Sequence, residues 1–593
     1  MAEAQGRHYP RGRMQEQAQE QEQVVICGGG LAGLTLARQL RRQLPGVSVV
    51  VVDRQARPLP EATHKVGESS VELGSRYFEH TLGLRDYLLE QHLVKNGLRF
   101  FPGGGHLPLA QRTELGPPQL PVVPSFQLDR GRFENDLRAF CEEDGVTLVE
   151  GVGVKDVRLA PSDTSDLHEI ELEDGRVLTA RWVVDASGRR RLLTRKLGLG
   201  EDSGHHAHAA WFRLDGRLDV GHLVPEEESA WHGRDLDGIR WLSTTHLMGE
   251  GYWAWIIPLS SGKTSIGIVA HGEVHDFTSM NTLERSLAWL EEHEPVLREK
   301  IAAFEVADFR CLKDYSYTST RCLSADRWAA VGEAGLFVDP FYSPGSDFIA
   351  LANVHTGELI RRELAGEDIR AHAEFVDWFY RRLAAISTET YSHAAKVYGQ
   401  PRVMAAKIYW DNFNYWAFVC QYFFQGLWAL DLEGQRRFVD VAQRFASLNL
   451  RAQRLFAAWA ARAADAPDGK SVVLPPIPSM LANLHLDLER EMSPDETLAY
   501  MDEKADAAEE LLTDLLLRAA AEVGDAVVAE SGASDWPLAG LDARVAAEDG
   551  PKRGRRRRLS KLARDVERCL GPVNGSVLEA GRRLRPAPLH AGA

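Results

Sequence analysis

A glycine-rich turn between a strand and a helix restricts the fold of this 593-residue chain more than any other feature of its sequence. Residues 28–33 read GGGLAG, which matches the pattern GxGxxG. An apolar strand at 24–27 precedes the turn, and the helix that follows has apolar residues at three- and four-residue spacing until Pro45. A second apolar run at 47–52 predicts a strand that is covered on both faces. This order of strand, turn, helix and strand predicts a βαβ unit that binds a dinucleotide.

Each glycine of this turn has a separate physical task. We expect Gly28 to permit the tight turn, Gly30 to let the backbone approach the diphosphate, and Gly33 to let the helix pack closely on the strand. The N–H groups at the start of the helix then face the diphosphate. Asp53 ends the second strand, where its carboxylate can accept hydrogen bonds from an adenosine ribose. The pattern by itself does not distinguish FAD from NAD.

Two later strand ends favour FAD. A strand at 177–184 is followed by Asp185, and a strand at 328–331 is followed by Gly332 and Glu333. Acidic and small residues at two further strand ends fit a large dinucleotide that lies across the sheet, whereas a single NAD-binding unit does not need them. The arrangement resembles flavoproteins of the hydroxylase type, in which the later acid binds the ribityl chain. That acid is usually aspartate, so Glu333 reaches one methylene further.

Composition and charge exclude several other classes of protein. A net charge of −16 argues against a general nucleic-acid binder, because binding to a phosphate backbone needs a basic surface. The longest apolar stretch, 413–430, contains Asn414, Gln421 and Gln425, so it predicts a buried helix and not a membrane span. The six cysteines form no CxxC pair and no signal peptide is evident, so we expect free thiols in a reducing cytoplasm.

The pattern of elements predicts an α/β fold with a Rossmann-type FAD-binding domain, an inserted antiparallel β-sheet domain for the substrate and a helical C-terminal region. In chain order we expect a disordered leader (1–23), the first part of the FAD-binding domain (24–200), the inserted sheet (201–320), the return segment of the FAD-binding domain (321–365), the helical region (366–530) and a disordered basic tail (531–593). Within the helical region, Ser493 and Pro494 predict the start of a helix that runs towards Gly524.

Four stretches resemble the flavin-dependent halogenase family. The glycine-rich turn is the first, and KVGES at 65–69 resembles the segment after the second strand of that family. Residues 253–258 read WAWIIP, a full WxWxIP, which is the family's most specific mark. The sequence DPFYSPG at 339–345 is similar to the loop that runs past the flavin. The resemblance extends from about 24 to 385 and is weaker in the helical region.

The resemblance implies that reduced FAD, oxygen and halide generate hypohalous acid, which reaches a lysine beside the substrate. Lys95 looks like the counterpart of this lysine. An ammonium there can hydrogen-bond hypohalous acid and hold it towards an electron-rich ring, or the amine can form a haloamine. The resemblance also implies that Trp253 and Trp255 crowd the flavin and discourage direct hydroxylation. The expected substrate is a phenol, a pyrrole or a carrier-bound acyl group.

The loop before the helical region departs from the family where the halide is expected. In the family, the residue before the glycine and the glycine itself lend backbone N–H groups to the halide; here these residues are Pro344 and Gly345, and proline has no N–H. Asp347 adds a carboxylate that would repel an anion. Tyr342 stands where tryptophan-specific members have glutamate, so free tryptophan is not the expected substrate. These departures favour a second hypothesis, an FAD-dependent monooxygenase of the same fold that does not use halide.

The predicted site contains no metal. Lys95 is the candidate catalytic residue, and no second GxGxxG for a nicotinamide cofactor is present, so we expect a separate flavin reductase to supply reduced FAD. We expect flavin contacts from Gly28, Gly30, Gly33, Asp53, Glu68, Ser69, Arg130, Asp185, Gly332, Glu333 and Gly345, and substrate or tunnel contacts from Trp253, Trp255, Pro344, Ser346 and Asp347.

Three other clusters have a structural and a functional interpretation. His205, His206 and His208 would need a fourth ligand and a shared face to bind a metal, so we expect no metal there. The dense aromatic residues at 409–428 form either core or the lining of an aromatic tunnel. The basic run at 552–558 is a solvated segment, or else a contact for an acidic carrier protein.

Overall fold

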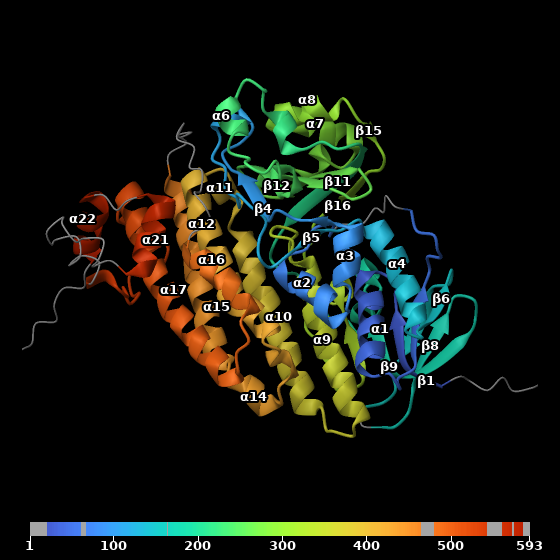
Figure 1. Cartoon of the computed structure of the whole chain (residues 1–593). Coiled ribbons are helices and arrows are strands. Elements are labelled where there is room, and N and C mark those ends of the chain that lie inside the picture. The colour runs from blue at the N-terminus through green and yellow to red at the C-terminus, as the bar shows by residue number, and fades with distance from the viewer. Residues whose placement is uncertain are drawn as a thin grey trace, which may run out of the picture.

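The computed structural model describes residues 21–60, 67–162, 164–463, 479–542, 560–571 and 575–584. Figure 1 shows a first sheet with its helices on the right, a second sheet at the top and a group of C-terminal helices on the left. The predicted leader lies outside the described residues except for 21–23, which belong to the first strand. Lys65 and the basic run at 552–558 also lie outside them.

The first sheet has the strand order β18-β19-β9-β1-β2-β6, with a short hairpin of β7 and β8 attached to β9. Its strands are β1 (Gln21–Cys27), β2 (Val49–Asp53), β6 (Thr147–Glu150), β7 (Val154–Arg158), β8 (His168–Leu172), β9 (Val177–Asp185), β18 (Leu323–Ser324) and β19 (Trp328–Ala330). The pairs among β6, β2, β1, β9 and β19 are parallel. Such pairing brings the carboxyl ends of these strands to one edge, where a dinucleotide binds in folds of this kind.

The apolar run of β2 is covered on both faces, as its sequence predicts. Val49 and Val51 pack with helix α1 (Leu31–Gln43) in the largest hydrophobic cluster, whereas Val50 and Val52 pack with the hairpin of β7 and β8 in a separate one. Two other helices pack on α1, namely α4 (Arg130–Glu143) and α9 (Gly345–Leu364). Burial of both faces accounts for the almost continuous run of valine in this strand.

The second sheet has the order β15-β11-β14-β13-β12-β4, and β16 also pairs with β11. Its strands are β4 (Leu98–Phe101), β11 (Ala207–Asp215), β12 (Thr244–Gly249), β13 (Tyr252–Pro258), β14 (Thr264–His271), β15 (Glu305–Val306) and β16 (Arg310–Leu312). All pairs are antiparallel except that of β4 with β12. The predicted boundary at 201 is therefore wrong for β4, which leaves the segment 24–200 to complete the edge of this sheet.

The WxWxIP stretch forms β13, and the alternation of a strand sends its residues to two different cores. Trp253, Trp255 and Ile257 belong to the cluster shared with the first sheet. Ala254 and Ile256 belong to the cluster on the opposite face, which α7 (Leu283–His293) and α8 (Pro295–Ile301) cover. Both tryptophans of the motif therefore face the first sheet.

The C-terminal helices pack against α9 and include α10 (Arg370–Ser392), α12 (Pro401–Asn414), α15 (Val439–Arg462), α16 (Ser479–Leu486) and α17 (Pro494–Val523). The predicted start of α17 is confirmed, because Ser493 caps it and exchanges hydrogen bonds with Glu496 in a capping box, while Gly524 follows its last residue. None of the helices among the described residues combines the length and the apolar character that crossing a membrane requires.

The prediction of disorder throughout 531–593 is wrong for two segments. Residues 561–570 and 575–584 form helices α21 (Lys561–Leu570) and α22 (Gly575–Leu584), and both contact α17. Leu562, Val566 and Cys569 of α21 are buried in the largest cluster. These positions follow the three- and four-residue spacing of an amphipathic helix, a signal that the local abundance of Gly, Pro, Ala and Arg obscured.

Candidate active site

A groove of about 500 Å³ lies beside the predicted dinucleotide turn. Residues 28–32 line it together with Asp53 at the end of β2 and the loop 186–190 after β9. Gly28 has a φ of +128°, and a Cβ at this position would lie 2.2 Å from the carbonyl oxygen of Ala186. The turn therefore has no room for a side chain at its first glycine.

Gly33 has the close approach that its position in the motif predicts. A Cβ there would lie 2.0 Å from the carbonyl oxygen of Gly28, so the helix packs too tightly on the turn to accept any other residue. Gly30 is the N-cap of α1, whose first N–H groups lack partners within the helix. These groups give the groove donors for a diphosphate.

The two predicted acids of the groove differ in where their carboxylates point. Asp53 lines the groove, and its Oδ2 accepts a hydrogen bond of 2.6 Å from Arg138. Asp185 is fully buried and lines neither this groove nor the cavity beyond it. Its oxygens accept hydrogen bonds from the backbone N–H groups of Ser187 and Leu193. Asp185 therefore stabilises the turn after β9.

A second cavity of about 90 Å³ continues the groove towards the second sheet. The residues that line both spaces are Leu31, Arg130, Glu333, Phe337 and Ile349. Trp253, Trp255 and His246 close the far side. We call this space the flavin cavity, because its flat aromatic walls at the end of a diphosphate groove suit a flavin ring.

Unpartnered donors support the fit of FAD to these two spaces. The indole N–H of Trp253 in the flavin cavity and that of Trp211 in the groove are buried without a hydrogen-bond partner among the described residues. Such donors are rare in protein interiors unless a ligand or water satisfies them. Together with the glycine turn and Asp53, they match the polar groups of a flavin dinucleotide.

The remaining predicted flavin residues occupy the walls of these spaces. Gly332 has a φ of +56° and lines the flavin cavity with Glu333. Arg130 donates a hydrogen bond of 2.6 Å to Glu134. Glu68 lines the cavity, but its carboxylate pairs with Arg213 of β11 at 2.6 Å, so it also ties the two sheets together.

His246 lines the flavin cavity and was not identified from the sequence. Its ring stacks on Phe100, and its Nδ1 lies 3.2 Å from the carbonyl oxygen of Arg99. Burial disfavours the imidazolium and lowers the pKa of His246 to about 3. The His246 ring is therefore neutral at physiological pH and adds no positive charge to the flavin cavity.

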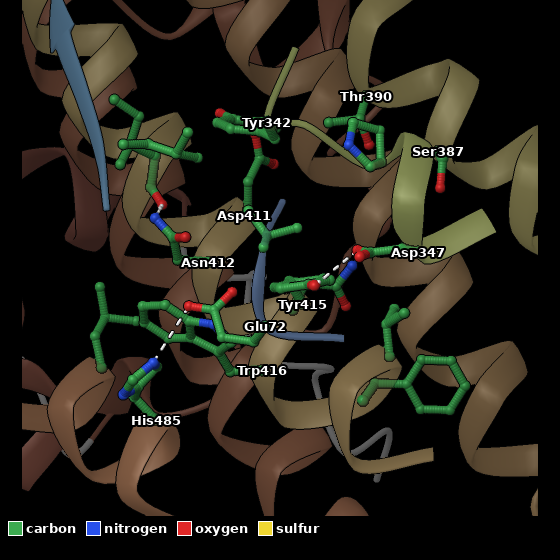
Figure 2. Close-up of a pocket in the computed structure, with 18 of the residues that line it drawn as sticks. Glu72, Tyr342, Asp347, Ser387, Thr390, Asp411, Asn412, Tyr415, Trp416 and His485 are labelled. Carbon is green, nitrogen blue, oxygen red and sulfur yellow. Dashed lines mark hydrogen bonds and ion pairs between the residues drawn. The ribbon is translucent and has the colours of Figure 1, made fainter. Parts of the chain in front are cut away.

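A third cavity of about 230 Å³ lies between α9 and the C-terminal helices. We call it the substrate cavity. Its walls come from Glu72 and Lys95, from β4, from residues 342–351 and from α10, α12, α15 and α16. Figure 2 shows Glu72, Asp347, Asp411, Tyr415, Trp416 and His485 around it. Tyr415, Trp416 and Phe418 of the aromatic stretch 409–428 line this cavity, whereas others, such as Trp410 and Phe413, are buried in the core. The stretch is thus partly core and partly cavity lining.

Lys95 separates the flavin cavity from the substrate cavity. It is fully buried, and its Nζ donates to Ser69 Oγ at 2.9 Å and to the carbonyl oxygen of Ser70 at 2.7 Å. Ser69 lines the flavin cavity and accepts a hydrogen bond of 3.1 Å from Ser343. Burial lowers the pKa of Lys95 to about 7, because desolvation disfavours the ammonium. The lysine thus lines the substrate cavity and bonds a serine that lines the flavin cavity.

The loop 339–345 is held under backbone strain between the same two cavities. Tyr342 and Ser343 have φ values of 66° and 60°, a region that residues with side chains rarely adopt. The Tyr342 hydroxyl donates to Asp411 at 2.8 Å, and at the other end of the loop Asp339 pairs with His205 at 2.7 Å. Strain that the surroundings enforce in this way is typical of functional loops.

The contact between His205 and Asp339 also explains part of the histidine cluster. Nε2 of His205 bonds Asp339, while His208 lies 3.6 Å from Asp314. Among the described residues, no group of three or more His, Cys, Asp or Glu side chains is arranged to hold a metal ion.

Asp347 faces the substrate cavity and not the flavin cavity. Its oxygens accept hydrogen bonds from the N–H of Gly74 at 2.8 Å and from the Tyr415 hydroxyl at 2.7 Å. Burial raises the pKa of Asp347 to about 7. Gly345 and Ser346, which precede it at the start of α9, line the flavin cavity instead.

Glu72 and His485 form a buried pair in the substrate cavity that the sequence did not indicate. Nε2 of His485 donates to Glu72 Oε1 at 3.2 Å, and the side chains are only 8% and 11% exposed, respectively. Burial raises the pKa of Glu72, but the hydrogen bond and the charge of His485 outweigh it and leave the pKa below its usual value. The two residues are 413 positions apart, so no local pattern could have paired them.

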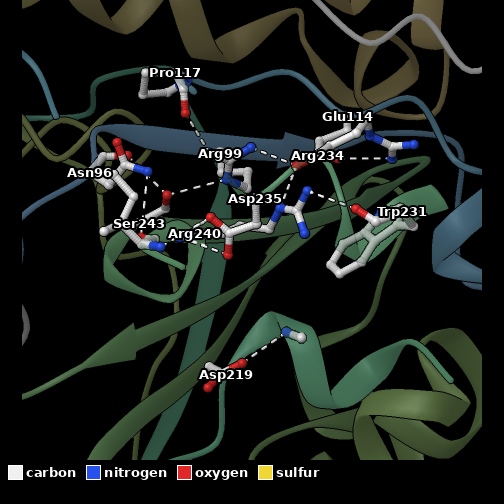
Figure 3. Close-up of polar contacts among 12 residues, drawn as sticks. Asn96, Arg99, Glu114, Pro117, Asp219, Trp231, Arg234, Asp235, Arg240 and Ser243 are labelled. Carbon is white, nitrogen blue, oxygen red and sulfur yellow. Dashed lines mark hydrogen bonds and ion pairs between the residues drawn. The ribbon is translucent and has the colours of Figure 1, made fainter. Parts of the chain in front are cut away.

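Three arginines gather around Glu114 next to Pro117, a residue that lines the substrate cavity (Figure 3). Arg99 pairs with Glu114 at 2.6 Å and donates to the carbonyl oxygen of Pro117, which lines the cavity. Arg234 and Arg240 also pair with Glu114, at 3.2 and 3.0 Å. Because three guanidinium groups share one carboxylate, the loop that contains Pro117 is firmly tied to β4 and the second sheet.

Comparisons with known proteins agree with this geometry. A family model described as tryptophan halogenase matches residues 109–361, and one described as an NAD(P)-binding Rossmann-like domain matches residues 26–90. The chain is similar to flavin-dependent halogenase chlA of Dictyostelium discoideum, with 28% identity over 428 residues, 66% of this chain and 69% of that protein. It is also similar to a 1H-pyrrole-2-carbonyl-(peptidyl-carrier protein) chlorinase of Pseudomonas fluorescens, with 27% identity over 365 residues, 57% of this chain and 75% of that protein.

Among solved structures, that of halogenase PltM in complex with phloroglucinol and FAD has the same fold. The TM-score is 0.60 at 16% identity, and the match covers 87% of this chain and 99% of that chain. The match in fold therefore extends well beyond the two sheets, into the C-terminal helices that enclose the substrate cavity.

Proposed function

We propose that this chain, which is similar to flavin-dependent halogenases, halogenates a small, free, electron-rich aromatic compound such as a phenol. The observation that carries this proposal is the position of Lys95 between the flavin cavity and a substrate cavity of about 230 Å³. A cavity of this kind, apolar with a few polar groups, suits a single small ring with hydroxyl substituents.

The C-terminal helices favour a free substrate over a carrier-bound one. They form most of the wall of the substrate cavity. The fold of the phloroglucinol-bound halogenase matches 87% of this chain, the C-terminal helices included. A carrier-bound acyl group remains the alternative substrate within the same activity, and its test is given below.

Bound reduced FAD supplies the oxidation of halide by oxygen to hypohalous acid. The residues of this chain then control where that acid reacts. The Lys95 ammonium can donate a hydrogen bond to its oxygen and hold its halogen towards the ring. As the ring carbon bonds the halogen, the oxygen–halogen bond breaks, and Lys95 can give a proton to the departing hydroxide to form water.

The start of α9 is the expected site of the halide. Pro344 has no N–H, but Gly345 and Ser346 follow it as the first residues of a 20-residue helix and line the flavin cavity. Their N–H groups have no partners within the helix, and the helix dipole favours an anion there. The Ser346 hydroxyl is also buried without a partner among the described residues. We therefore expect the two donors to be those of Gly345 and Ser346, one position later than in the family.

Two further parts of the proposal concern the cellular context. We expect a separate flavin reductase, because the sequence has a single GxGxxG. We also expect the enzyme to act in the cytoplasm, because all six cysteines are free thiols, which persist in a reducing compartment.

The test is a reaction of the purified protein with FAD, a flavin reductase, NADH, oxygen and either chloride or bromide. Free phenols, pyrroles and the same rings on a carrier protein are offered as substrates, and products are identified by mass. Halogenated free phenol is expected. A gain of one oxygen would support the monooxygenase that the missing N–H of Pro344 favours, and halogenation of the carrier-bound rings alone would overturn the free-substrate proposal.

A further inference from the structure

We propose that Glu72, held in place by its hydrogen bond from His485, is the base that takes the proton of the substrate's phenolic hydroxyl during halogenation. This inference rests on the proposed function and deepens it, because it assigns the substrate class a recognition group. A phenolate is a far better nucleophile towards an electrophilic halogen than a phenol is. A carboxylate in the same cavity as Lys95 could therefore activate the ring while Lys95 directs the halogen.

The pair spans two distant parts of the fold and meets in the wall of the substrate cavity. Glu72 opens the short helix α2 (Glu72–Arg76), and His485 lies near the end of α16. The indole of Trp416 packs edge-on against the His485 ring, with 5.0 Å between the ring centroids. Glu72, His485 and Lys95 all line the same cavity, which Figure 2 shows for the first two.

Glu72 is the carboxylate in this cavity that receives the fewest hydrogen bonds from other residues. Both oxygens of Asp347 already accept hydrogen bonds, from Gly74 and Tyr415. Asp411 accepts hydrogen bonds from Tyr342 and Gln453 and pairs with Lys407. Glu72 receives a side-chain hydrogen bond from His485 on Oε1 alone. Its own backbone N–H also acts on the carboxylate, so a ligand in the cavity would share Glu72 with these two donors.

The charged and titratable groups that act on Glu72 come from every element packed around it. They are His485 of α16, Lys95 before β4, Asp347 of α9, Tyr415 of the π-helical turn Tyr415–Val419 and Cys420. His485 and Lys95 favour the ionised carboxylate, whereas Asp347 disfavours it. The cluster thus favours the ionised carboxylate of Glu72, which can act as a base, and the Lys95 ammonium in the same cavity can supply a proton.

The proposed cycle returns every proton. The phenolic O–H bond breaks and its proton moves to Glu72, so the oxygen's electrons enter the ring. The ring carbon bonds the halogen, the oxygen–halogen bond breaks, and the hydroxide takes a proton from Lys95 to become water. The ring C–H proton then returns to Lys95, and the proton on Glu72 returns to the phenolic oxygen. One phenol and one hypohalous acid give one halophenol and one water.

Glu72→Gln tests the proposal with two groups of phenols, one with a pKa near about 10 and one ionised at the assay pH. We expect kcat on the neutral phenols to fall by about 100-fold, the range that general bases contribute, while the ionised phenols keep most of their rate. FAD binding and the release of hypohalous acid, measured with a diffusible 1,3-diketone trap, should not change. Glu79→Gln, outside the cavity, is the matched control.

A second variant keeps the proposal testable if Glu72→Gln alters folding. In His485→Ala the pKa of Glu72 should rise, because burial raises this pKa and the variant lacks the hydrogen bond and the charge of His485 that lower it. The low-pH limit of activity on neutral phenols should therefore move to higher pH. An equal loss on both groups of phenols, or an unmoved limit, would overturn the role of the pair. Failure of the wild type to halogenate any phenol would instead overturn the proposed function.

Discussion

The dinucleotide groove and the substrate cavity of this protein are built in opposite ways. In the groove, the turn 28–33 has no room for a Cβ at Gly28 or Gly33, so backbone atoms set its shape there. The substrate cavity is built from side chains that lie between residues 71 and 485 on many separate elements. A groove shaped by backbone atoms suits a ligand that does not vary. A cavity lined by side chains can be adapted to a particular substrate by single substitutions.

The largest effect is expected from removing Lys95, which lies between the flavin cavity and the substrate cavity. Lys95→Met should lower halogenation by about 1,000-fold, because it removes both the hydrogen bond to the oxidant and a proton donor. Flavin binding, followed by absorbance, should remain. Lys155→Met, at an exposed site, is the control. Retained halogenation would disprove the role of Lys95, and loss of the flavin would mean that the two spaces are not separable.

A change in the groove should act on the flavin first. Gly28→Ala places a Cβ against the carbonyl oxygen of Ala186 and strains a positive φ, so FAD affinity should fall by about 100-fold or the fold should be lost. Gly46→Ala is the matched control, because nothing lies within 4 Å of its Cβ position. Equilibrium titration with FAD measures both. Equal affinities would show that the turn tolerates a side chain and that its backbone geometry is not decisive.

The substrate cavity should also respond to a residue that does not line it. Asp565 of α21 is buried and accepts the N–H groups of Ser479 and Met480 at the start of α16, the helix that carries His485. Asp565→Ala removes this cap, which costs about 1 kcal/mol, and should lower kcat/KM on neutral phenols by about tenfold. Arg568→Ala on the exposed side of α21 is the control. An effect on FAD affinity instead would show that α21 supports the groove.

The smallest effect expected is on stability, and it has a definite pH dependence. The pKa of Lys95 falls to about 7 on folding, so between pH 7 and its unfolded pKa of about 10.4 the unfolded chain binds the extra proton. Stability of the wild type should therefore rise with pH across this window, by up to roughly 1.4 kcal/mol per unit. Lys95→Met has no titrating group at this position. At pH 7 its Tm should therefore be a few degrees higher than that of the wild type, and this difference should shrink towards pH 10. A constant difference would contradict the shifted pKa.

The local parts of the fold were predictable, because each rests on neighbours in the sequence. The turn at 28–33, the two-sided burial of β2 and the capped start of α17 at Ser493 are all confirmed. The predicted inserted sheet is likewise present, and WxWxIP forms its strand β13. In each case the spacing of a few residues carries the physical constraint.

The parts that escaped prediction depend on partners far away in the chain. Nothing in residues 98–101 shows that they complete the second sheet, because their partner strand lies at 244–249. The order in α21 depends on its burial against α17. Asp185 occupies a predicted flavin position, yet its carboxylate bonds the backbone of its own loop.

The sequence by itself determined the dinucleotide turn and the two sheets in outline, since these depend on steric and hydrogen-bonding rules within short segments, and it singled out Lys95 only by resemblance to flavin-dependent halogenases. Only the tertiary structure decided which side chains meet Lys95 in the substrate cavity. Glu72 and His485 become partners because α16 is packed and capped in one position. A pocket lined by side chains from distant parts of the sequence forms only once the surrounding helices are packed together. Their packing depends on contacts throughout the chain.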